Sequence, residues 1–228
     1  MDDVTKDITY FRFCGEVNTR RVLQLARRRC DQLALNTVVI ASETGRSALQ
    51  AVEAFRETGV QIIVVTHYPA TTWGPRGDIR IGLKRPEYAE TSRQLLEKGA
   101  HLVQGSIPFA PPSRSIGWDY PTPEAIMDKT LELFGAGTKI AIEVALMATD
   151  AGEVPEGDEI ITCAGTFKGL DTALVVRTAY SMNLFKEFEV REIIAKSRYR
   201  VRELPEYTYE NWQGDLDPYY PETGPKDE

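Results

Sequence analysis

The chain has 228 residues and an apolar fraction of 42%, which is typical of a globular protein and excludes disorder of the whole chain. No apolar run approaches the ~20 residues that a membrane-spanning helix needs, and the acidic first residues are unlike a signal peptide. We therefore expect a cytoplasmic protein without a membrane partner. Three widely separated cysteines, with no Cys-x-x-Cys pair, predict neither a disulfide framework nor a zinc site.

The net charge of −7 is concentrated at the end of the chain, because residues 203–228 hold eight acidic residues and one lysine. The body is balanced, so it has no general field that would gather nucleic acid, and we predict no nucleic-acid partner. We divide the chain into one domain over residues 1–202 and an acidic arm over residues 203–228. The arm is rich in tyrosine, which favours an ordered arm over a disordered tail.

The first two predicted elements are a strand and a helix. Residues 8–13 are rich in strand formers and predict a short edge strand. Residues 17–34 place apolar side chains at three- and four-residue spacing, which indicates a helix with one apolar face. Asn18 or Thr19 is expected to cap the first turn of this helix.

A β-α-β unit follows and is the clearest structural signal in the sequence. Residues 37–41 and 60–66 are continuous β-branched runs, as is typical of parallel strands buried on both faces. Between them, apolar residues at helical spacing continue to Gly59. Strand, helix and strand together have the length of a conventional β-α-β unit.

The remainder of the chain predicts helices and strands interrupted by long loops. Loops over residues 67–85 and 105–123 are long for a compact domain, and such loops usually serve function. The helices are expected over residues 86–98, 123–134, 138–151 and 189–196, and the strands over residues 101–104, 159–164 and 172–178.

A polar turn, residues 42–47, lies between the first buried strand and its helix. In parallel sheets, ligands collect where the carboxyl ends of strands meet helix N-termini. A helix start offers unpaired N–H groups and partial positive charge, which suit a phosphate. The turn therefore predicts a phosphate site, with a merely capped helix start as the alternative. Its residues are Ser42, Glu43, Thr44, Gly45, Arg46 and Ser47, which combine three hydroxyls, a guanidinium and a glycine that allows close approach.

Residues 37–48, Thr-Val-Val-Ile-Ala-Ser-Glu-Thr-Gly-Arg-Ser-Ala, resemble part of the α/β domain at the C-terminus of pyruvate kinases. In that family the matching turn holds a phosphate of a sugar-phosphate activator. Further segments are similar to stand-alone prokaryotic proteins built from this domain, and the resemblance covers about residues 8–198. These segments are Ile-Ile-Val-Val-Thr (62–66), Leu-Phe-Gly-Ala-Gly-Thr-Lys (133–139), Glu-Val-Ala-Leu-Met-Ala (143–148), Asp-Ala-Gly (150–152) and Ala-Gly-Thr-Phe-Lys-Gly-Leu-Asp-Thr-Ala (164–173).

The resemblance implies an α/β fold of three layers, α/β/α, around a mainly parallel mixed sheet like that of the pyruvate kinase C-terminal domain. It implies a small phosphorylated ligand, and some stand-alone members look like binders of flavin mononucleotide (FMN), which is therefore the expected cofactor. Self-association is also implied, because the domain lies at subunit contacts in pyruvate kinase. The chain is too short for the kinase barrel, so no pyruvate kinase activity is expected.

Two further groups of residues are candidates for the same site. Thr66 ends the second buried strand and His67 follows it directly, so they should reach the edge of the sheet that carries the turn. His67 is also a candidate acid or base, because histidine titrates near neutral pH, although it is equally consistent with a loop residue without a ligand. The connection between the last two strands of the resembling region adds Gly165, Thr166, Asp171 and Thr172, with a tight hairpin as the alternative.

Glu143 lies in the apolar helix predicted over residues 138–151. A buried carboxylate needs partners or a raised pKa, and catalytic acids arise in this way. An ion pair with Lys139, four residues earlier, is the simpler interpretation. His101 begins a strand at the opposite edge and is expected to be structural. With two histidines and no clustered carboxylates, the sequence predicts no metal site.

Three functions stay open at this point. The first is a binder of a phosphorylated ligand, with FMN as the specific expectation. The second is an enzyme acting on a phosphorylated metabolite, with His67 or Glu143 as acid or base, and the third is a regulatory or scaffold subunit. The sequence contains no nucleophile-base-orienter series that would name a reaction.

Overall fold

The structure, a computed structural model, describes residue 3 and residues 5–72, 78–110, 113–117, 120–166 and 168–198. The predicted arm over residues 203–228 lies outside these ranges, so its order stays a prediction. Within the described part of the chain, no helix combines the length and apolar character needed to cross a bilayer.

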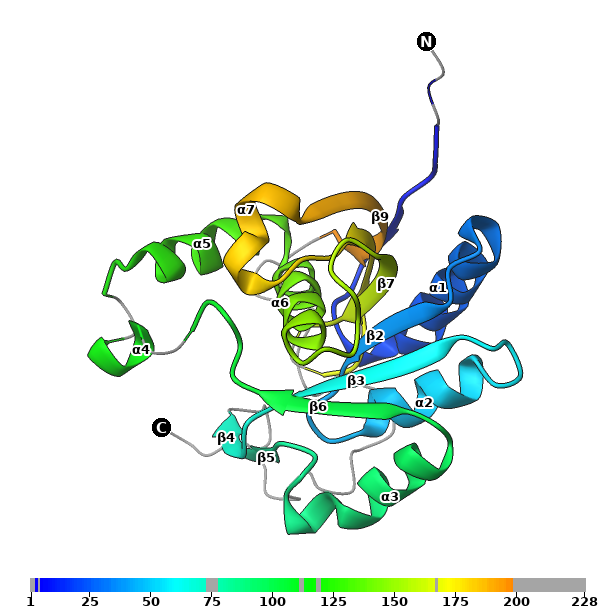
Figure 1. Ribbon diagram of the computed structural model, residues 1–228, viewed down its shortest axis with the longest axis horizontal. Coiled ribbons are helices and arrows are strands. Elements are labelled where there is room, and N and C mark those ends of the chain that lie inside the picture. The colour runs from blue at the N-terminus through cyan, green and yellow to red at the C-terminus, as the bar shows by residue number, and fades with distance from the viewer. Residues whose placement is uncertain are drawn as a thin grey trace.

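A mixed sheet of seven strands forms the middle layer of the described residues (Figure 1). Four of its six neighbouring pairs are parallel, and the two antiparallel pairs are those that the strand at 172–177 makes with its neighbours on either side. The order across the sheet is β1 (Thr9–Phe11), β9 (Glu189–Ser197), β8 (Thr172–Arg177), β7 (Glu159–Ala164), β2 (Thr37–Ala41), β3 (Gln61–His67) and β6 (His101–Gly105).

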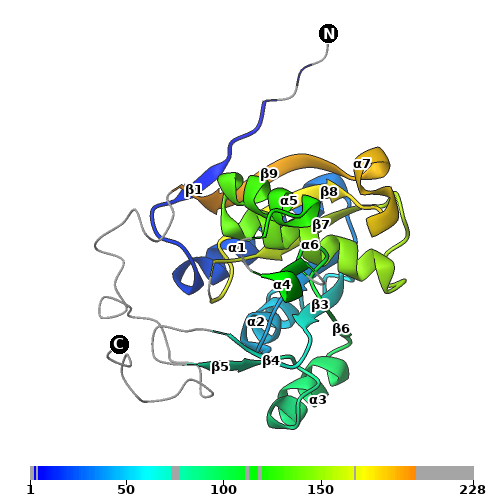
Figure 2. The same cartoon turned by 90° about the vertical axis from the view of Figure 1, so that its left-hand side faces the viewer.

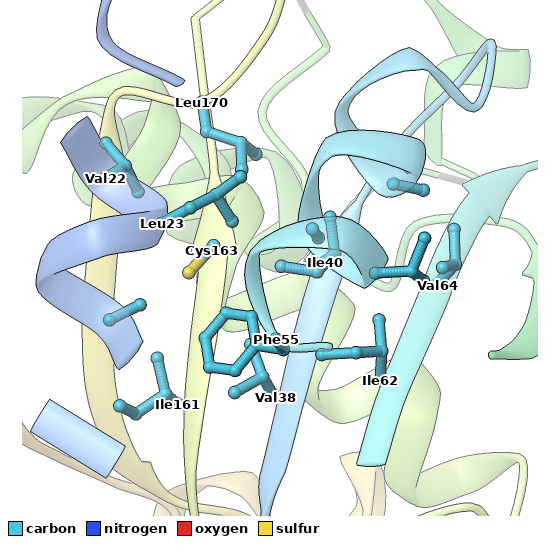
Figure 3. Packing of buried hydrophobic residues seen from close by; sticks show 14 of the residues in the cluster. Val22, Leu23, Val38, Ile40, Phe55, Ile62, Val64, Ile161, Cys163 and Leu170 are labelled. Atoms are coloured by element: carbon cyan, nitrogen blue, oxygen red, sulfur yellow. The ribbon is translucent and has the colours of Figure 1, made fainter. Parts of the chain in front are cut away.

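Helices cover one face of this sheet through a large hydrophobic cluster. Val38 and Ile40 of β2 point into it, and α1 (Thr19–Leu33), α2 (Arg46–Ala54) and α3 (Ala89–Glu97) supply the facing side chains. Figure 3 shows Val22 and Leu23 of α1, with Phe55 after α2, packed over the strands.

The opposite face of the sheet carries a second cluster. Val39, between the two β2 residues of the first cluster, points into it, because side chains alternate along a strand. Helix α6 (Ala136–Asp150) is buried nearly all round against this face, and α5 (Pro123–Leu131) packs beside it (Figure 2). The three-layer α/β/α prediction is therefore confirmed.

The short segments are α4 (Ser113–Ile116), α7 (Leu184–Glu187) and 3₁₀ turns at Glu16–Asn18, Pro86–Tyr88, Glu132–Phe134 and Ser181–Asn183.

The predicted β-α-β unit is confirmed as β2, α2 and β3. β2 pairs in parallel with β3 from Thr37 opposite Gln61 to Ala41 opposite Val65. The strand prediction over residues 37–41 matches β2 residue for residue, because a continuous β-branched run between two helical layers has only one way to bury both faces.

The helix predicted over residues 189–196 is wrong, because this segment is strand β9. β9 pairs with β8 on one side and β1 on the other. Its pairing with β8 has two register shifts, at which Arg191 and Ile194 of β9 have no partner residue in β8. Such bulges break the two-residue alternation of a strand. Without that alternation, the spacing of the apolar residues resembles one face of a helix. Hydrogen bonding to β8 and β1 nevertheless makes the segment a strand.

Part of the predicted loop over residues 67–85 is a β-hairpin. β4 (Ala70–Thr72) and β5 (Ile79–Ile81) pair antiparallel outside the main sheet. Ile79 and Ile81 are buried against Ala70 in a small cluster of their own. Three-residue strands are too short for a periodicity to be read from sequence.

The predicted side-chain cap of α1 is also wrong. Asn18 occupies the cap position but its side-chain amide donates to the carbonyl oxygen of Phe13 at 2.7 Å. The hydroxyl of Thr19 accepts a hydrogen bond from the N–H of Leu170 at 2.9 Å. The Asn18 bond is therefore local to the N-terminal segment, whereas the Thr19 bond connects the start of α1 to the β7–β8 connection.

Two adjacent leucines of α3 test this packing. Leu95 is fully buried in the first cluster, whereas Leu96 is 56% exposed. We expect Leu95→Ala to lower the free energy of unfolding by about 2–5 kcal/mol, because it leaves a cavity in the core. Leu96→Ala, the matched control, should change it by less than about 0.5 kcal/mol. Chemical denaturation of both variants checks this, and equal losses would contradict the packing of α3.

Candidate ligand-binding cleft

A cleft of about 710 Å³ opens where the carboxyl ends of β2, β3 and β7 meet. Parallel strands place these ends at one edge of the sheet, where connecting loops and helix starts converge. Much of the wall is apolar, and the hairpin β4–β5 forms one side. The lining residues are Glu16, Thr19, Ala41, Ser42, Glu43, Thr44, Arg46, Ser47, Gln50, His67, Tyr68, Ala70, Thr71, Thr72, Ile79, Ile81, Ile107, Ala110, Ser115, Lys139, Ile140, Gly165, Lys168 and Gly169.

The turn between β2 and α2 is held by its backbone. The N–H of Ser42 donates to the carbonyl oxygen of Val65 at 2.9 Å, and the carbonyl oxygen of Glu43 accepts from the N–H of Gly82 at 3.1 Å. These bonds connect the turn to β3 and to the residue that follows β5. The backbone of the turn is therefore fixed from both sides.

Helix α2 begins directly after Gly45, which has a φ of +87° and cannot cap the helix with a side chain. Ser42 Oγ accepts a long hydrogen bond, 3.4 Å, from the N–H of Ala48. Among the described residues, the N–H groups of Arg46 and Ser47 have no hydrogen-bond partner. The cap alternative thus accounts for one N–H of the first turn and leaves the N–H groups of Arg46 and Ser47 unexplained.

Glu43 brings a carboxyl group into the turn. Its Oε2 accepts hydrogen bonds from the N–H of His67 at 3.0 Å and from the hydroxyl of Thr66 at 3.3 Å. Burial raises the pKa of Glu43 to about 7, although these two hydrogen bonds lower it. The carboxyl group is therefore about half protonated near neutral pH.

Arg46 and Lys139 bring positive charge to the cleft and are held in place by carboxylates. Arg46 pairs with Glu16 at 2.5 Å, and Lys139 Nζ lies 2.9 Å from both Asp128 Oδ1 and Glu132 Oε1. Burial lowers the pKa of Lys139, but the hydrogen bonds with Glu132 and Asp128 outweigh it and raise the pKa above its ordinary value. Lys139 is therefore a fixed cation rather than a neutral amine.

The connection between β7 and β8 contributes less to the cleft than predicted. Of its four candidates, Gly165 lines the cleft. Asp171 is fully buried, and its Oδ2 accepts from the N–H groups of Gly15 at 2.7 Å and Thr166 at 3.0 Å. Its Oδ1 accepts from the hydroxyl of Thr172 at 2.8 Å. In the described residues, Asp171 acts as an anchor for the N-terminal segment.

The remaining candidates separate into two locations. His67 lines the cleft, as expected for a residue at the end of β3, whereas Thr66 is buried beneath it. Glu143 is fully buried outside the lining, where it accepts from the N–H of Phe109 at 3.2 Å. The predicted ion pair of Glu143 with Lys139 is wrong, because the ammonium group of Lys139 pairs with Asp128 of α5 and with Glu132 just after it.

His101 begins β6 at the opposite edge of the sheet, and its Nδ1 lies 2.7 Å from Glu153. Its predicted separation from the turn of residues 42–47 is therefore confirmed. Among the described residues, no group of three or more histidine, cysteine, aspartate and glutamate side chains is arranged to hold a metal ion.

Sequence reasoning missed several residues of the cleft. Lys139 and Lys168 lie within segments that carry the family resemblance. That resemblance could have marked both lysines as candidate site residues. Glu16 had none, because it reaches the cleft only through packing of the N-terminal segment. Gly169 shows how tight this packing is: a β-carbon there would lie 2.4 Å from the Cα of Glu16.

Residues 20–176 match the family described as "Pyruvate kinase, alpha/beta domain", and the chain belongs to this family. Among solved structures, it is similar to a pyruvate kinase from Cryptosporidium parvum, with 15% identity and a TM-score of 0.34, over 70% of this chain and 22% of that one. A second structure, Cryptosporidium parvum pyruvate kinase in complex with ADP, has 15% identity and a TM-score of 0.35, over 70% of this chain and 23% of that one. The chain thus spans less than a quarter of the length of these kinases.

Gly45 offers a direct test of the geometry of the turn. A β-carbon at Gly45 would lie 2.3 Å from the Cγ2 methyl of Thr91, whereas one at Gly99 would meet nothing within 4 Å. Both glycines have positive φ, so alanine at Gly99 should cost only the backbone strain, about 1–2 kcal/mol. Gly45→Ala should cost about 1–3 kcal/mol more, because the packing is too tight to admit the methyl group.

The second substitution Thr91→Ser removes the methyl group that collides. If the geometry is right, the free energy of unfolding of the double variant Gly45→Ala/Thr91→Ser exceeds the sum expected from the two single variants. Simple additivity in denaturant unfolding would show that Thr91 does not press on the turn.

Proposed function

We propose that this protein binds a small phosphorylated molecule, with the phosphate held at the turn of residues 42–47 and the first turn of α2. The observation that carries the proposal is the pair of N–H groups of Arg46 and Ser47, which open a helix without a partner in the described residues. Two such groups and the positive end of a helix favour an anion. The charge of Arg46 and the hydroxyl groups of the turn support the same choice.

The remainder of the cleft suits an organic group attached to that phosphate. Its volume of about 710 Å³ lies within the range of small-molecule sites. Buried Ile79 and Ile81 provide an apolar wall, and the ring centroids of His67 and Tyr68 lie 4.0 Å apart at the same cleft. Apolar surface and aromatic rings favour a flat ring system.

FMN combines these requirements, because it has a terminal phosphate and a planar ring, and we propose it as the ligand. The turn would hold its phosphate, and the hairpin wall with Tyr68 would contact its ring. When bound, FMN supplies one- and two-electron redox chemistry, while the protein provides binding and orientation.

An enzyme acting on a phosphorylated metabolite is the second candidate function. One observation favours it: His67 lines the cleft next to the phosphate turn, where a histidine can transfer a proton near neutral pH. Binding energy at the phosphate would then position the reacting group. Glu143 is a weaker candidate for acid or base, because it is fully buried and is not part of the lining.

The phosphate preference is tested with FMN and riboflavin, which differ by the phosphate alone. We expect FMN to bind about 100-fold more tightly, since two charge-assisted hydrogen bonds of about 1.5 kcal/mol each are lost in riboflavin. Flavin fluorescence measures both affinities, with inorganic phosphate as competitor. Equal affinities would refute a phosphate site at the turn. If no flavin binds but inorganic phosphate still raises the melting temperature, only the flavin assignment is wrong.

Lys168 and Lys98 form a matched pair of variants, because only Lys168 of the two lines the cleft. Lys98 follows α3, and its Nζ lies 3.7 Å from Oε2 of Glu53, near the end of α2 that is away from the turn. We expect Lys168→Met to weaken FMN binding about tenfold or more, because a cation near the phosphate is lost. Lys98→Met should change it less than twofold. Equal effects of the two substitutions would place the ligand outside this cleft.

A further inference from the structure

Glu43 places a carboxyl group inside the turn to which the proposed function assigns a phosphate. The side chain lines the cleft, and both of its hydrogen bonds, from His67 N–H and from the Thr66 hydroxyl, are made by the same oxygen, Oε2. Oε1 accepts no hydrogen bond within the described residues. An ionised carboxylate at this position would repel a bound phosphate, because both groups are negatively charged. With a phosphate-ester dianion it could also form no hydrogen bond, since both groups only accept.

The charged groups around the turn do not neutralise Glu43. From α2, Arg46 pairs with Glu16. From the end of β3, His67 gives Glu43 a backbone N–H, and the Nδ1 of its ring faces the carbonyl oxygen of Tyr68 at 3.3 Å. The hairpin side presents the N–H of Gly82 to the backbone oxygen of Glu43. Two lysines also line the cleft: Lys168, and Lys139, which is paired with Asp128 and Glu132.

We propose that Glu43 makes phosphate binding proton-coupled: one proton is taken up from solvent and shared between the Glu43 carboxyl group and a phosphate oxygen. This inference rests on the proposed function. Oε2 keeps its two hydrogen bonds, and Oε1 carries the proton that it donates to the phosphate. The site therefore binds a phosphate dianion only together with one proton. It disfavours the dianion when Glu43 is ionised.

The charge state of Glu43 makes this coupling effective in the neutral range. Burial raises the pKa of Glu43 to about 7 in the free protein. A bound phosphate raises it further, because a nearby negative charge favours the protonated form. Above pH 7 the free protein has lost the proton that the complex retains, so binding must take it up, and the affinity falls about tenfold for each pH unit.

Phosphate monoesters and inorganic phosphate differ in the number of protons that their dianions carry, and this difference allows a test. The dianion of an ester such as phenyl phosphate has no proton, whereas the dianion of inorganic phosphate still carries one. The ester therefore needs the proton from solvent, and inorganic phosphate can supply its own. We expect proton uptake near one per molecule for phenyl phosphate at pH 8–9 and much less for inorganic phosphate.

The experiment is calorimetric titration of the full chain at pH 8 and pH 9 in buffers with different ionisation enthalpies. Glu43→Gln keeps an oxygen for the N–H of His67 and adds a permanent N–H donor. We expect its affinity for phenyl phosphate to be nearly independent of pH, without proton uptake, and at pH 9 to exceed that of the wild type by about 100-fold. A merely structural role of Glu43 would produce weaker binding instead.

Two controls make the outcome decisive. Glu53→Gln changes an exposed carboxylate near the other end of the same helix and should retain the wild-type pH profile. His67→Gln should retain the proton uptake. If uptake persists in Glu43→Gln, disappears in His67→Gln, or is absent from the wild type while both anions bind, the proposal for Glu43 is wrong and the phosphate site stands. If neither anion binds the wild type, the proposed function fails and this inference fails with it.

Discussion

The parallel pairing of β2 with β3 and β7 is the constraint on which the cleft depends. Because these strands run in one direction, the polar turn after β2, His67 at the end of β3 and Gly165 after β7 must lie at the same edge of the sheet. The pairing is fixed in turn by burial of both faces of β2, where Val39 faces α6 while Val38 and Ile40 face α1 and α2. A slip of one residue would exchange the two sets of side chains, so register and site geometry are determined together.

The elements that could be predicted from sequence are those whose pattern and packing agree. Residues 37–41 form a strand for the same reason that they look like one, namely burial on both faces. β9 could not be predicted, because its two bulges remove the alternation and only pairing with β8 and β1 makes it a strand. Within the cleft, the turn had a local signal, whereas Glu16 depends on contacts between residues about 150 positions apart, such as the hydrogen bond from Leu170 to Thr19.

Two cations of the cleft, Arg46 and Lys139, are held in place by carboxylates of the protein itself. Arg46 is paired with Glu16, and Lys139 is paired with two carboxylates from the α5 side. Exposed ion pairs contribute little to stability, but Lys139 and Asp128 are buried, so the position of the ammonium group is strongly constrained. Such constraint lowers the entropy that binding would otherwise lose, which is an advantage for a binding site and none for a solvated surface.

The polar turn violates several local rules for stability at once. A helix start is stabilised by a serine or aspartate cap, yet α2 begins after a glycine and leaves two N–H groups without a partner in the described residues. Glu43 adds a second cost: because its pKa is raised, the folded state loses stability as the pH rises from the ordinary pKa of glutamate, 4.5, to about 7, and does not regain it above that. A fold that needed only to connect β2 to α2 has simpler solutions. Unfavourable local features that gather at one edge of an otherwise consistent sheet are expected where binding, rather than folding, determines the sequence.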